Sequence, residues 1–322
     1  MMNQKFKKVL IYSLIASLGG LLFGFDIAIF SGTIPFITPL FQLSPESLGW
    51  VASCLYVGCV IGAISFGKIT AFLGRKPSLF IVSIIFIISS VMMGLAKHVD
   101  ELIIWRIIAG FSVGGASILS PLYIAEISPM QVRGKMVSIN QLAIVIGILL
   151  AYFSNYFLSH LELNWRLMFI SGCLPAGLFI IGAFFLPESP KWLIHKGRDE
   201  QALKALSKLI PAPDLQHEFL EIKQARLAES TNQKGSFALI FSNKSYLMLV
   251  FIAIVIAVFQ QISGANAVLF YAPIIFERVG MDVNDQLLIQ IMIGSVNLIF
   301  TLIAIRFVDK VGRKRLMLVG AG

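Results

Sequence analysis

The sequence predicts an all-α membrane protein, a helical bundle with eight complete transmembrane spans and the start of a ninth. Apolar residues make up 57% of the 322 residues, against roughly 45 to 50% in soluble domains. Charged residues make up 13%, against roughly 25% in soluble domains. Apolar runs long enough to cross a hydrocarbon core of about 30 Å as helices recur along the chain. This composition excludes a soluble globular fold.

Each span is identified by an apolar run between charged or turn-forming residues. The first run follows three lysines, as in a signal peptide, but its length and the lack of a small-x-small cleavage site predict a retained helix. Gly58 and Gly62, and Gly110 and Gly114, have the small-xxx-small spacing that lets helices approach closely. A ninth span begins near residue 316. The eight complete spans are expected at residues 10–32, 48–67, 78–96, 103–124, 136–159, 167–186, 246–276 and 287–308.

The composition becomes charged and helix-forming between the sixth and seventh spans. Leucines at helical spacing predict two short amphipathic helices there, whose apolar faces would contact either the membrane domain or a partner. We therefore expect three parts: an N-terminal six-helix half (1–187), a cytoplasmic helical linker (188–244) and a partial C-terminal half (245–322).

A short motif occurs at equivalent places in the two halves. Leu-Gly-Arg-Lys at 73–76 follows the second span, and Val-Gly-Arg-Lys at 311–314 follows the eighth. Duplicated six-span halves are typical of secondary transporters, which bind their substrate between the halves. Because two such halves contain twelve spans, we expect the sequence to be C-terminally truncated.

The basic residues predict the orientation of the chain. The formal net charge is +9, and 21 of the 26 Lys and Arg residues fall in the N-terminal tail and in alternate loops. The opposite loops contain only Lys97, Arg166 and Arg278. Since Lys and Arg accumulate on the cytoplasmic side, the N-terminus is expected in the cytoplasm, and the positive charge does not indicate nucleic-acid binding.

The sequence contains no constellation typical of an enzyme. Cys54, Cys59 and Cys173 fall inside spans without CxxC spacing, which favours packing roles. The four histidines are scattered over loops without metal-ligand spacing. No nucleophile or paired carboxylates suggest catalysis. We therefore expect no enzymatic activity, no cofactor and no metal site.

Asp26 and Arg106 are charged residues within apolar spans. A charge at mid-membrane costs roughly 2.5 to 3.5 kcal/mol on insertion scales, so it needs a partner or a function. Helix geometry places both residues in the outer half of the membrane. We expect an ion pair, which would either carry a proton on Asp26 or join two spans as a static salt bridge.

Amide side chains cluster in the seventh and fifth spans. The seventh contains Gln260, Gln261 and Asn266, with Gly264 as a place where the helix could loosen, and the fifth contains Asn140 and Gln141. Primary amides donate and accept hydrogen bonds at once, which suits the vicinal hydroxyls of a sugar. The alternative is that these amides join helices through hydrogen bonds worth about 0.6 to 2 kcal/mol each.

At these residues the chain closely resembles the sugar porter family of the major facilitator superfamily, which includes bacterial xylose and galactose proton symporters and animal glucose facilitators. The resemblance covers essentially everything from residue 10 onward. The motifs that carry it are GGLLFGFDIAIFSG (19–32), LGRK (73–76), WRIIAG (105–110), SPLYIAEISPMQVRGK (120–135), NQLA (140–143), PESPKWL (187–193), FQQISGANAVLFYAP (259–273) and VDKVGRK (308–314).

The resemblance implies a role for specific residues of this chain. A monosaccharide would be bound by Gln141, Gln260, Gln261 and Asn266, and Asp26 would take up the proton with Arg106 as its partner. Phe270 stands in place of a family tyrosine at the gate, where Tyr271 remains. The cytoplasmic latch of the family would comprise Arg75, Glu126, Arg133, Glu188 and Arg313.

The sequence thus predicts a secondary active transporter that imports a pentose or hexose with protons by alternating access. The alternatives are a proton-independent sugar facilitator, a truncated transport-dead fragment and a sugar-binding sensor. The expected partners are a monosaccharide, the proton and the lipid bilayer, without nucleic acid. We expect a monomeric multi-pass protein of the bacterial inner membrane.

Overall fold

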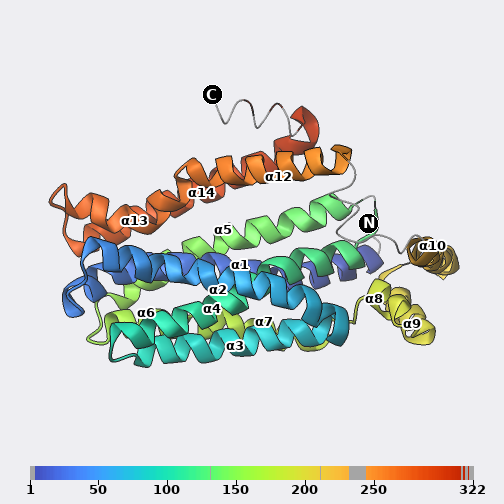
Figure 1. Ribbon diagram of the computed structural model, residues 1–322, viewed down its shortest axis with the longest axis horizontal. Coiled ribbons are helices and arrows are strands. Elements are labelled where there is room, and N and C mark those ends of the chain that lie inside the picture. The colour runs from blue at the N-terminus through green and yellow to red at the C-terminus, as the bar shows by residue number, and fades with distance from the viewer. Residues whose placement is uncertain are drawn as a thin grey trace.

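The computed structural model describes residues 4–130, 132–210, 212–231, 244–312, 315 and 318. Eight helices in this part of the chain are long and apolar enough to cross a membrane, which confirms the predicted number of complete spans. The predicted ninth span, from residue 316, falls almost entirely outside the described residues. Figure 1 shows the long helices side by side, with the short helices of the linker gathered at one end.

The N-terminal half contains six spans, of which the sixth consists of two consecutive helices. In chain order they are α1 (Gln4–Leu40), α2 (Pro45–Leu73), α3 (Arg75–Leu95), α4 (Val99–Ile127), α5 (Arg133–Leu158) and the pair α6 (Asn164–Ser171) and α7 (Cys173–Phe185).

The remaining helices belong to the linker and to the C-terminal part of the chain. The linker contains α8 (Pro190–His195), α9 (Asp199–Leu209) and α10 (Ala212–Thr231). The seventh span is the pair α12 (Lys244–Ile262) and α13 (Ala265–Glu277), and the eighth is α14 (Val283–Val311).

Helix α1 continues eight residues beyond its predicted end at Gly32 and includes Pro35 and Pro39. The expected boundary was wrong because proline does not end a membrane helix when neighbouring groups satisfy the carbonyls that it frees. The extension lets α1 reach the turn before α2, where Ser44 caps the new helix by accepting a bond from Ser47 N.

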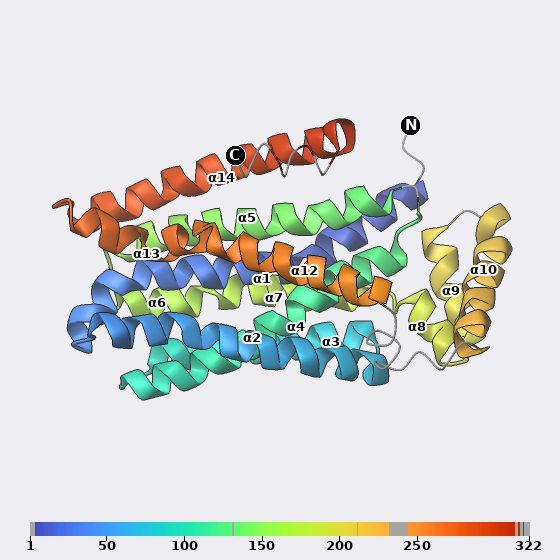
Figure 2. The same cartoon turned by 45° about the horizontal axis from the view of Figure 1, so that its top comes forward.

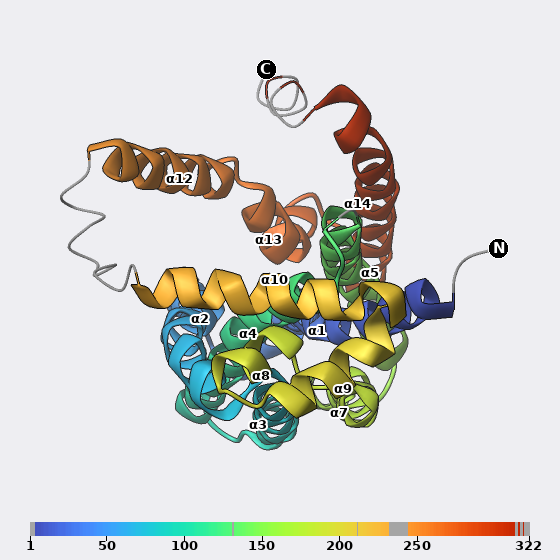
Figure 3. The same cartoon turned by 90° about the vertical axis from the view of Figure 1, so that its right-hand side faces the viewer.

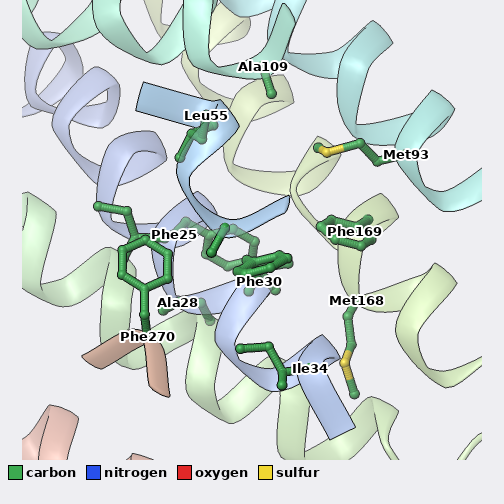
Figure 4. Packing of buried hydrophobic residues seen from close by; sticks show 14 of the residues in the cluster. Phe25, Ala28, Phe30, Ile34, Leu55, Met93, Ala109, Met168, Phe169 and Phe270 are labelled. Atoms are coloured by element: carbon green, nitrogen blue, oxygen red, sulfur yellow. The ribbon is translucent and has the colours of Figure 1, made fainter. Parts of the chain in front are cut away.

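Helix α1 is the central helix of the bundle and packs against α4, α5, α7 and α13. Phe25, Phe30 and Ile34 of α1 are buried in the main hydrophobic cluster. Figure 4 shows these side chains together with Phe169 of α6 and Phe270 of α13. The core therefore joins the C-terminal part of the chain to the N-terminal half through α1.

Helices α2 and α4 approach each other through glycines, as their spacing predicts. A Cβ atom on Gly58 would lie 2.0 Å from the carbonyl oxygen of Ile107, and one on Gly110 would lie 2.0 Å from that of Leu55. No side chain fits into such a gap, so the backbones are in direct contact.

The two halves meet mainly at the end of the molecule where α1 stops. There α13 packs against α1, and α14 packs along α5. The described side chains of α12, from residue 246 to 262, are instead exposed or half-buried. Figure 3 shows α12 standing away from α1 and α2 on the side that faces the linker, and Figure 2 shows α12 running back from the linker end toward α13. The halves are thus separated toward the linker end.

The described residues of the linker, up to 231, form three helices, one more than the two predicted. The additional helix, α8, forms because Ser189 accepts a bond from Trp192 N and Pro190 occupies the first turn. Trp192, Leu206 and Phe219 bury their side chains between the three helices. The indole nitrogen of Trp192 also donates to the Ala71 carbonyl, 3.1 Å away, which ties the linker to α2.

Glu188, in the loop before α8, caps the N-terminus of α3. Its carboxylate accepts hydrogen bonds from the backbone nitrogens of Arg75 at 2.9 Å, Lys76 at 3.2 Å and Ser189 at 2.8 Å. The approach requires Gly74, with φ 105°, because a Cβ there would lie 2.4 Å from Glu188 Oε2. Burial raises the pKa of Glu188 above its ordinary value, although these amides and the charge of Arg75 oppose the shift.

The glycine contact predicts a position-specific loss of stability. Gly58→Ala should destabilise the fold by about 1 to 3 kcal/mol, because the new methyl group forces α2 away from α4. Gly67→Ala is the matched control, since Gly67 lies on the same helix and a Cβ atom there would have no neighbour within 4 Å. Thermal unfolding in detergent should show a lower midpoint for the first variant only. Equal midpoints would contradict the contact.

The raised pKa of Glu188 predicts a pH dependence with a definite sign. Above the ordinary glutamate pKa, about 4.3, the folded state retains a proton that the unfolded chain has lost, so stability falls as the pH rises through the folded-state pKa. Glu188→Gln has no such proton. The unfolding midpoint of the wild type, relative to that of Glu188→Gln, should therefore decline as the pH rises above the ordinary glutamate pKa of about 4.3. If the unfolding midpoints of the two proteins changed with pH in parallel, the raised pKa of Glu188 would be contradicted.

Candidate functional site

The seventh span is interrupted where the polar residues cluster. Helix α12 ends at Ile262 and α13 begins at Ala265, with Gly264 between them at φ 75°. This is the left-handed region that glycine adopts at no steric cost. The structure thus places a helix break at the glycine singled out in the sequence, beside the amides.

A cavity of about 460 Å³ lies between this break and α2. Asn266 Nδ2 donates to Gln261 Oε1 at 2.9 Å, which orients the two amides toward each other. Each amide retains further donor or acceptor capacity, so the pair could bind adjacent hydroxyl groups of a ligand. The lining residues are Ala52, Ser53, Tyr56, Gln261, Asn266, Ala267, Phe270 and Tyr271.

The aromatic residues of α13 form one wall of this cavity. Phe270 is buried, with its ring centroid 6.1 Å from that of Tyr56 and 6.2 Å from that of Phe30. Tyr271, the expected gating residue, also lines the cavity. An apolar ring at position 270 therefore makes aromatic contacts with α1 and α2 in place of the hydroxyl that the resemblance implied.

Two of the expected sugar ligands do not line this cavity. Gln260 and Gln141 are both exposed, on α12 and α5 respectively, and neither belongs to the cavity wall. Asn140, the neighbour of Gln141, is buried close to Gly20, and its Oδ1 has no hydrogen-bond partner. The structure therefore brings together Gln261 and Asn266 but leaves the α5 amides apart from them.

Arg106 is fully buried on α4 and interacts with α2 and α1. Its Nε donates to the Val51 carbonyl at 2.8 Å, and its Nη2 donates to that of Ala52 at 3.4 Å. The guanidinium carbon lies 3.7 Å from the centroid of the Phe30 ring, a cation–π geometry. Two of the five N–H groups of Arg106 thus donate to carbonyls of α2, while Nη1 has no hydrogen-bond partner.

Asp26 is 3% exposed and does not form the expected ion pair with Arg106 among the described residues. That expectation was wrong for this conformation because Arg106 is held by the α2 carbonyls and by Phe30. Asp26 Oδ2 has no hydrogen-bond partner. The side chain instead borders a small void beside Phe86 and Ser90 of α3. A buried carboxyl oxygen without a hydrogen-bond partner is a position that can hold a proton.

The expected cytoplasmic latch is partly assembled at the linker end. Arg75 Nε and Nη2 donate to the two oxygens of Glu126 at 2.8 and 2.6 Å, a bidentate pair that joins α3 to α4. Glu188 binds the same corner through its backbone contacts. Arg133 donates only to the Ser128 carbonyl, 3.4 Å away, and its Nε is unpaired. Arg313 lies outside the described residues.

Sequence reasoning missed several polar residues that join the two halves. Gln290 and Ser31 are fully buried, and Gln290 Nε2 donates to Ser31 Oγ at 3.2 Å. Gln286, one turn earlier on α14, is also buried. Two glutamines four residues apart in the eighth span were a signal that could have identified them, since uncompensated amides in a membrane are costly.

Comparison with known proteins places this geometry in a family. The chain matches the model of the family described as sugar (and other) transporter over residues 12–322. It is 38% identical to the D-xylose-proton symporter of Escherichia coli K12, with 99% of this chain and 71% of the relative covered. It is also 38% identical to the galactose-proton symporter of the same organism, with 95% and 65% covered. The chain thus spans about two thirds of the length of these relatives.

Solved structures give the same result. The proton:xylose symporter XylE bound to 6-bromo-6-deoxy-D-glucose superposes with a TM-score of 0.86 at 38% identity, covering 97% of this chain and 72% of the other. A partially occluded inward-open form of XylE from E. coli gives 0.84 at 37% identity, covering 97% and 76%. With a family match over nearly its whole length and a shared helical bundle, the chain belongs to the sugar transporters of the major facilitator superfamily, a family of transporters and not of enzymes.

Proposed function

We propose that this protein imports a monosaccharide together with protons by alternating access. The observation that carries the proposal is the cavity in which Gln261 and Asn266 pair at 2.9 Å beside a helix break. The relatives that the chain matches are named as symporters of xylose, galactose and arabinose with protons. Paired amides suit the hydroxyls that these sugars share.

We assign Asp26 as the residue that takes up the proton. Arg106 is assigned as its partner, whose distance from Asp26 changes with the conformation. A carboxyl in an apolar setting exchanges protons according to what lies near it, because an approaching guanidinium favours the charged form. Here the guanidinium is held by α2 carbonyls, and Oδ2 of Asp26 is unpaired. A movement of α2 that releases Arg106 would allow it to reach the carboxylate. Proton uptake would thereby depend on the conformation of the bundle.

The relation between the halves supports alternating access. The halves are packed together at the end where α1 stops and are separated where the exposed α12 faces the linker. We assign the N-terminus and the linker to the cytoplasm of a bacterium, in its inner membrane, so that the separated end faces inward. Gln141 and Gln260 would join the site when the halves approach, and Tyr271 would close it. Arg75, Glu126, Arg133, Glu188 and Arg313 would hold the cytoplasmic end in the opposite state. We assign the working unit as a monomer.

The proton assignment predicts a loss of coupling on Asp26→Asn. Uptake of a sugar such as xylose into proteoliposomes should follow an imposed pH gradient in the wild type. It should become independent of the gradient in this variant, because an asparagine side chain neither takes up nor releases a proton. Ser90→Ala, at the same small void, is the matched control and should keep the coupling. Gradient-driven uptake by Asp26→Asn would contradict the assignment, and gradient-independent uptake by the wild type would identify a facilitator.

The sugar assignment predicts a loss of affinity on Gln261→Ala. Removing this amide should weaken monosaccharide binding about tenfold or more, since it abolishes its own contacts and the orientation of Asn266. Equilibrium binding in detergent measures this without requiring transport. Ser263→Ala is the control, because Ser263 bonds only to the Gln260 carbonyl of its own helix. Unchanged affinity in Gln261→Ala would favour a packing role for the amide.

A further inference from the structure

The helix α13 exposes backbone acceptors to the N-terminal half because it contains a proline. Pro273 has no N–H, so the carbonyl of Leu269, four residues earlier, has no partner within the helix. In a membrane such a carbonyl must be satisfied by a neighbouring group. The carbonyl of Phe270, one residue later, also accepts a hydrogen bond from the N-terminal half.

Three buried side chains supply donors at this place. Ser31 Oγ of α1 donates to the Phe270 carbonyl at 3.0 Å, and Tyr152 Oη of α5 donates to the Leu269 carbonyl at 3.4 Å. Gln290 Nε2 of α14 donates to Ser31 Oγ at 3.2 Å. Ser31 thus donates its one hydroxyl hydrogen to α13 and accepts a hydrogen bond from α14, so the single hydroxyl links both helices to α1.

Every one of these hydrogen bonds crosses from the N-terminal half to the C-terminal part of the chain. Ser31 and Gln290 are 0% exposed, and Tyr152 is 1% exposed, so water does not compete for the bonds. They lie at the end where α1 stops, where the halves are packed together. Opening of this end would have to break all of them at once.

We propose that Ser31, Tyr152, Gln290 and the two α13 carbonyls, here called the α13 bridge, hold this end of the transporter closed and must separate for it to open. The inference rests on the proposed alternating-access function. It assigns Ser31 and Gln290 as positioning residues, which act on the equilibrium between conformations without touching sugar or proton. Ser31 is the central member, since two of the three bonds pass through it.

The test is the reactivity of one reporter cysteine in the detergent-solubilised full chain. The native Cys54, Cys59 and Cys173 are replaced by alanine, and Ile34→Cys is introduced. Ile34 is 2% exposed and lies on α1 beside the cavity between α1 and α13. A bulky thiol reagent should therefore label this cysteine only during transient opening of the closed end.

Gln290→Met should raise the labelling rate about threefold. This factor corresponds to the average free-energy contribution of one hydrogen bond between membrane helices. Ser31→Ala removes two bonds and should raise the rate about tenfold. Combining the two should add little, because Gln290 bonds to Ser31. Tyr152→Phe, which deletes only a hydroxyl, provides a further variant should the others fold poorly, and it should raise the rate up to about threefold.

Two controls separate opening from general loosening. Thr33→Val removes a buried hydroxyl two residues from Ser31 that bonds only to the Phe30 carbonyl of its own helix, so the rate should not change. A second reporter, Val82→Cys, lies at 0% exposure inside the N-terminal half and should stay protected in every variant.

Faster labelling at position 34 alone supports the α13 bridge. Unchanged labelling in Ser31→Ala and Tyr152→Phe overturns it, as does an equal rise at position 82 or in Thr33→Val. The measurement uses neither sugar nor a proton gradient. A failure of sugar binding or of proton coupling is therefore registered separately from a failure of the bridge.

Discussion

The arrangement of this bundle depends on the need to satisfy backbone carbonyls where water is absent. Several buried side chains donate to carbonyls of a neighbouring helix rather than to other side chains. Arg106 binds the Val51 carbonyl of α2, Asn155 of α5 binds that of Ala28 in α1 at 2.9 Å, and Ser31 binds that of Phe270. Such bonds set the register between helices that are otherwise joined by apolar contact, because lipid offers no competing partner.

The same requirement separates the two intramembrane charges. Arg106 donates to the Val51 carbonyl of α2 and lies over the face of Phe30, and Oδ2 of Asp26 is buried without a hydrogen-bond partner. A static salt bridge would have made both groups structural. In this structure Arg106 is instead hydrogen-bonded to α2, and the proposed proton role of Asp26 depends on that separation.

Glycine and proline determine where this bundle is rigid and where it can change. Gly58 and Gly110 bring α2 and α4 into backbone contact, because no side chain separates the helices at these positions. Gly264 divides the seventh span into α12, whose side chains are exposed, and α13, which is packed on α1. Pro273 then frees a carbonyl that a residue of the other half can bind. The seventh span is therefore attached to the N-terminal half at one end only.

The sequence by itself determined the number of complete spans, the glycine contacts and the break at Gly264, because each depends on local residue type or on a spacing within one or two segments. The family resemblance placed Arg75 and Glu126 in one latch, but only the structure shows that these two residues pair. The sequence did not predict the helix α8, the length of α1 beyond Pro35, or the partners of Arg106. The extent of α1 and the partners of Arg106 were decided only by the tertiary structure, since a tolerated proline and a buried guanidinium depend on groups far away in the chain. Helix α8 is different, because its cap from Ser189 to Trp192 N is local and was a signal within the sequence. The pairing of Gln290 with Ser31 spans 259 residues of sequence, and no local pattern could have revealed it.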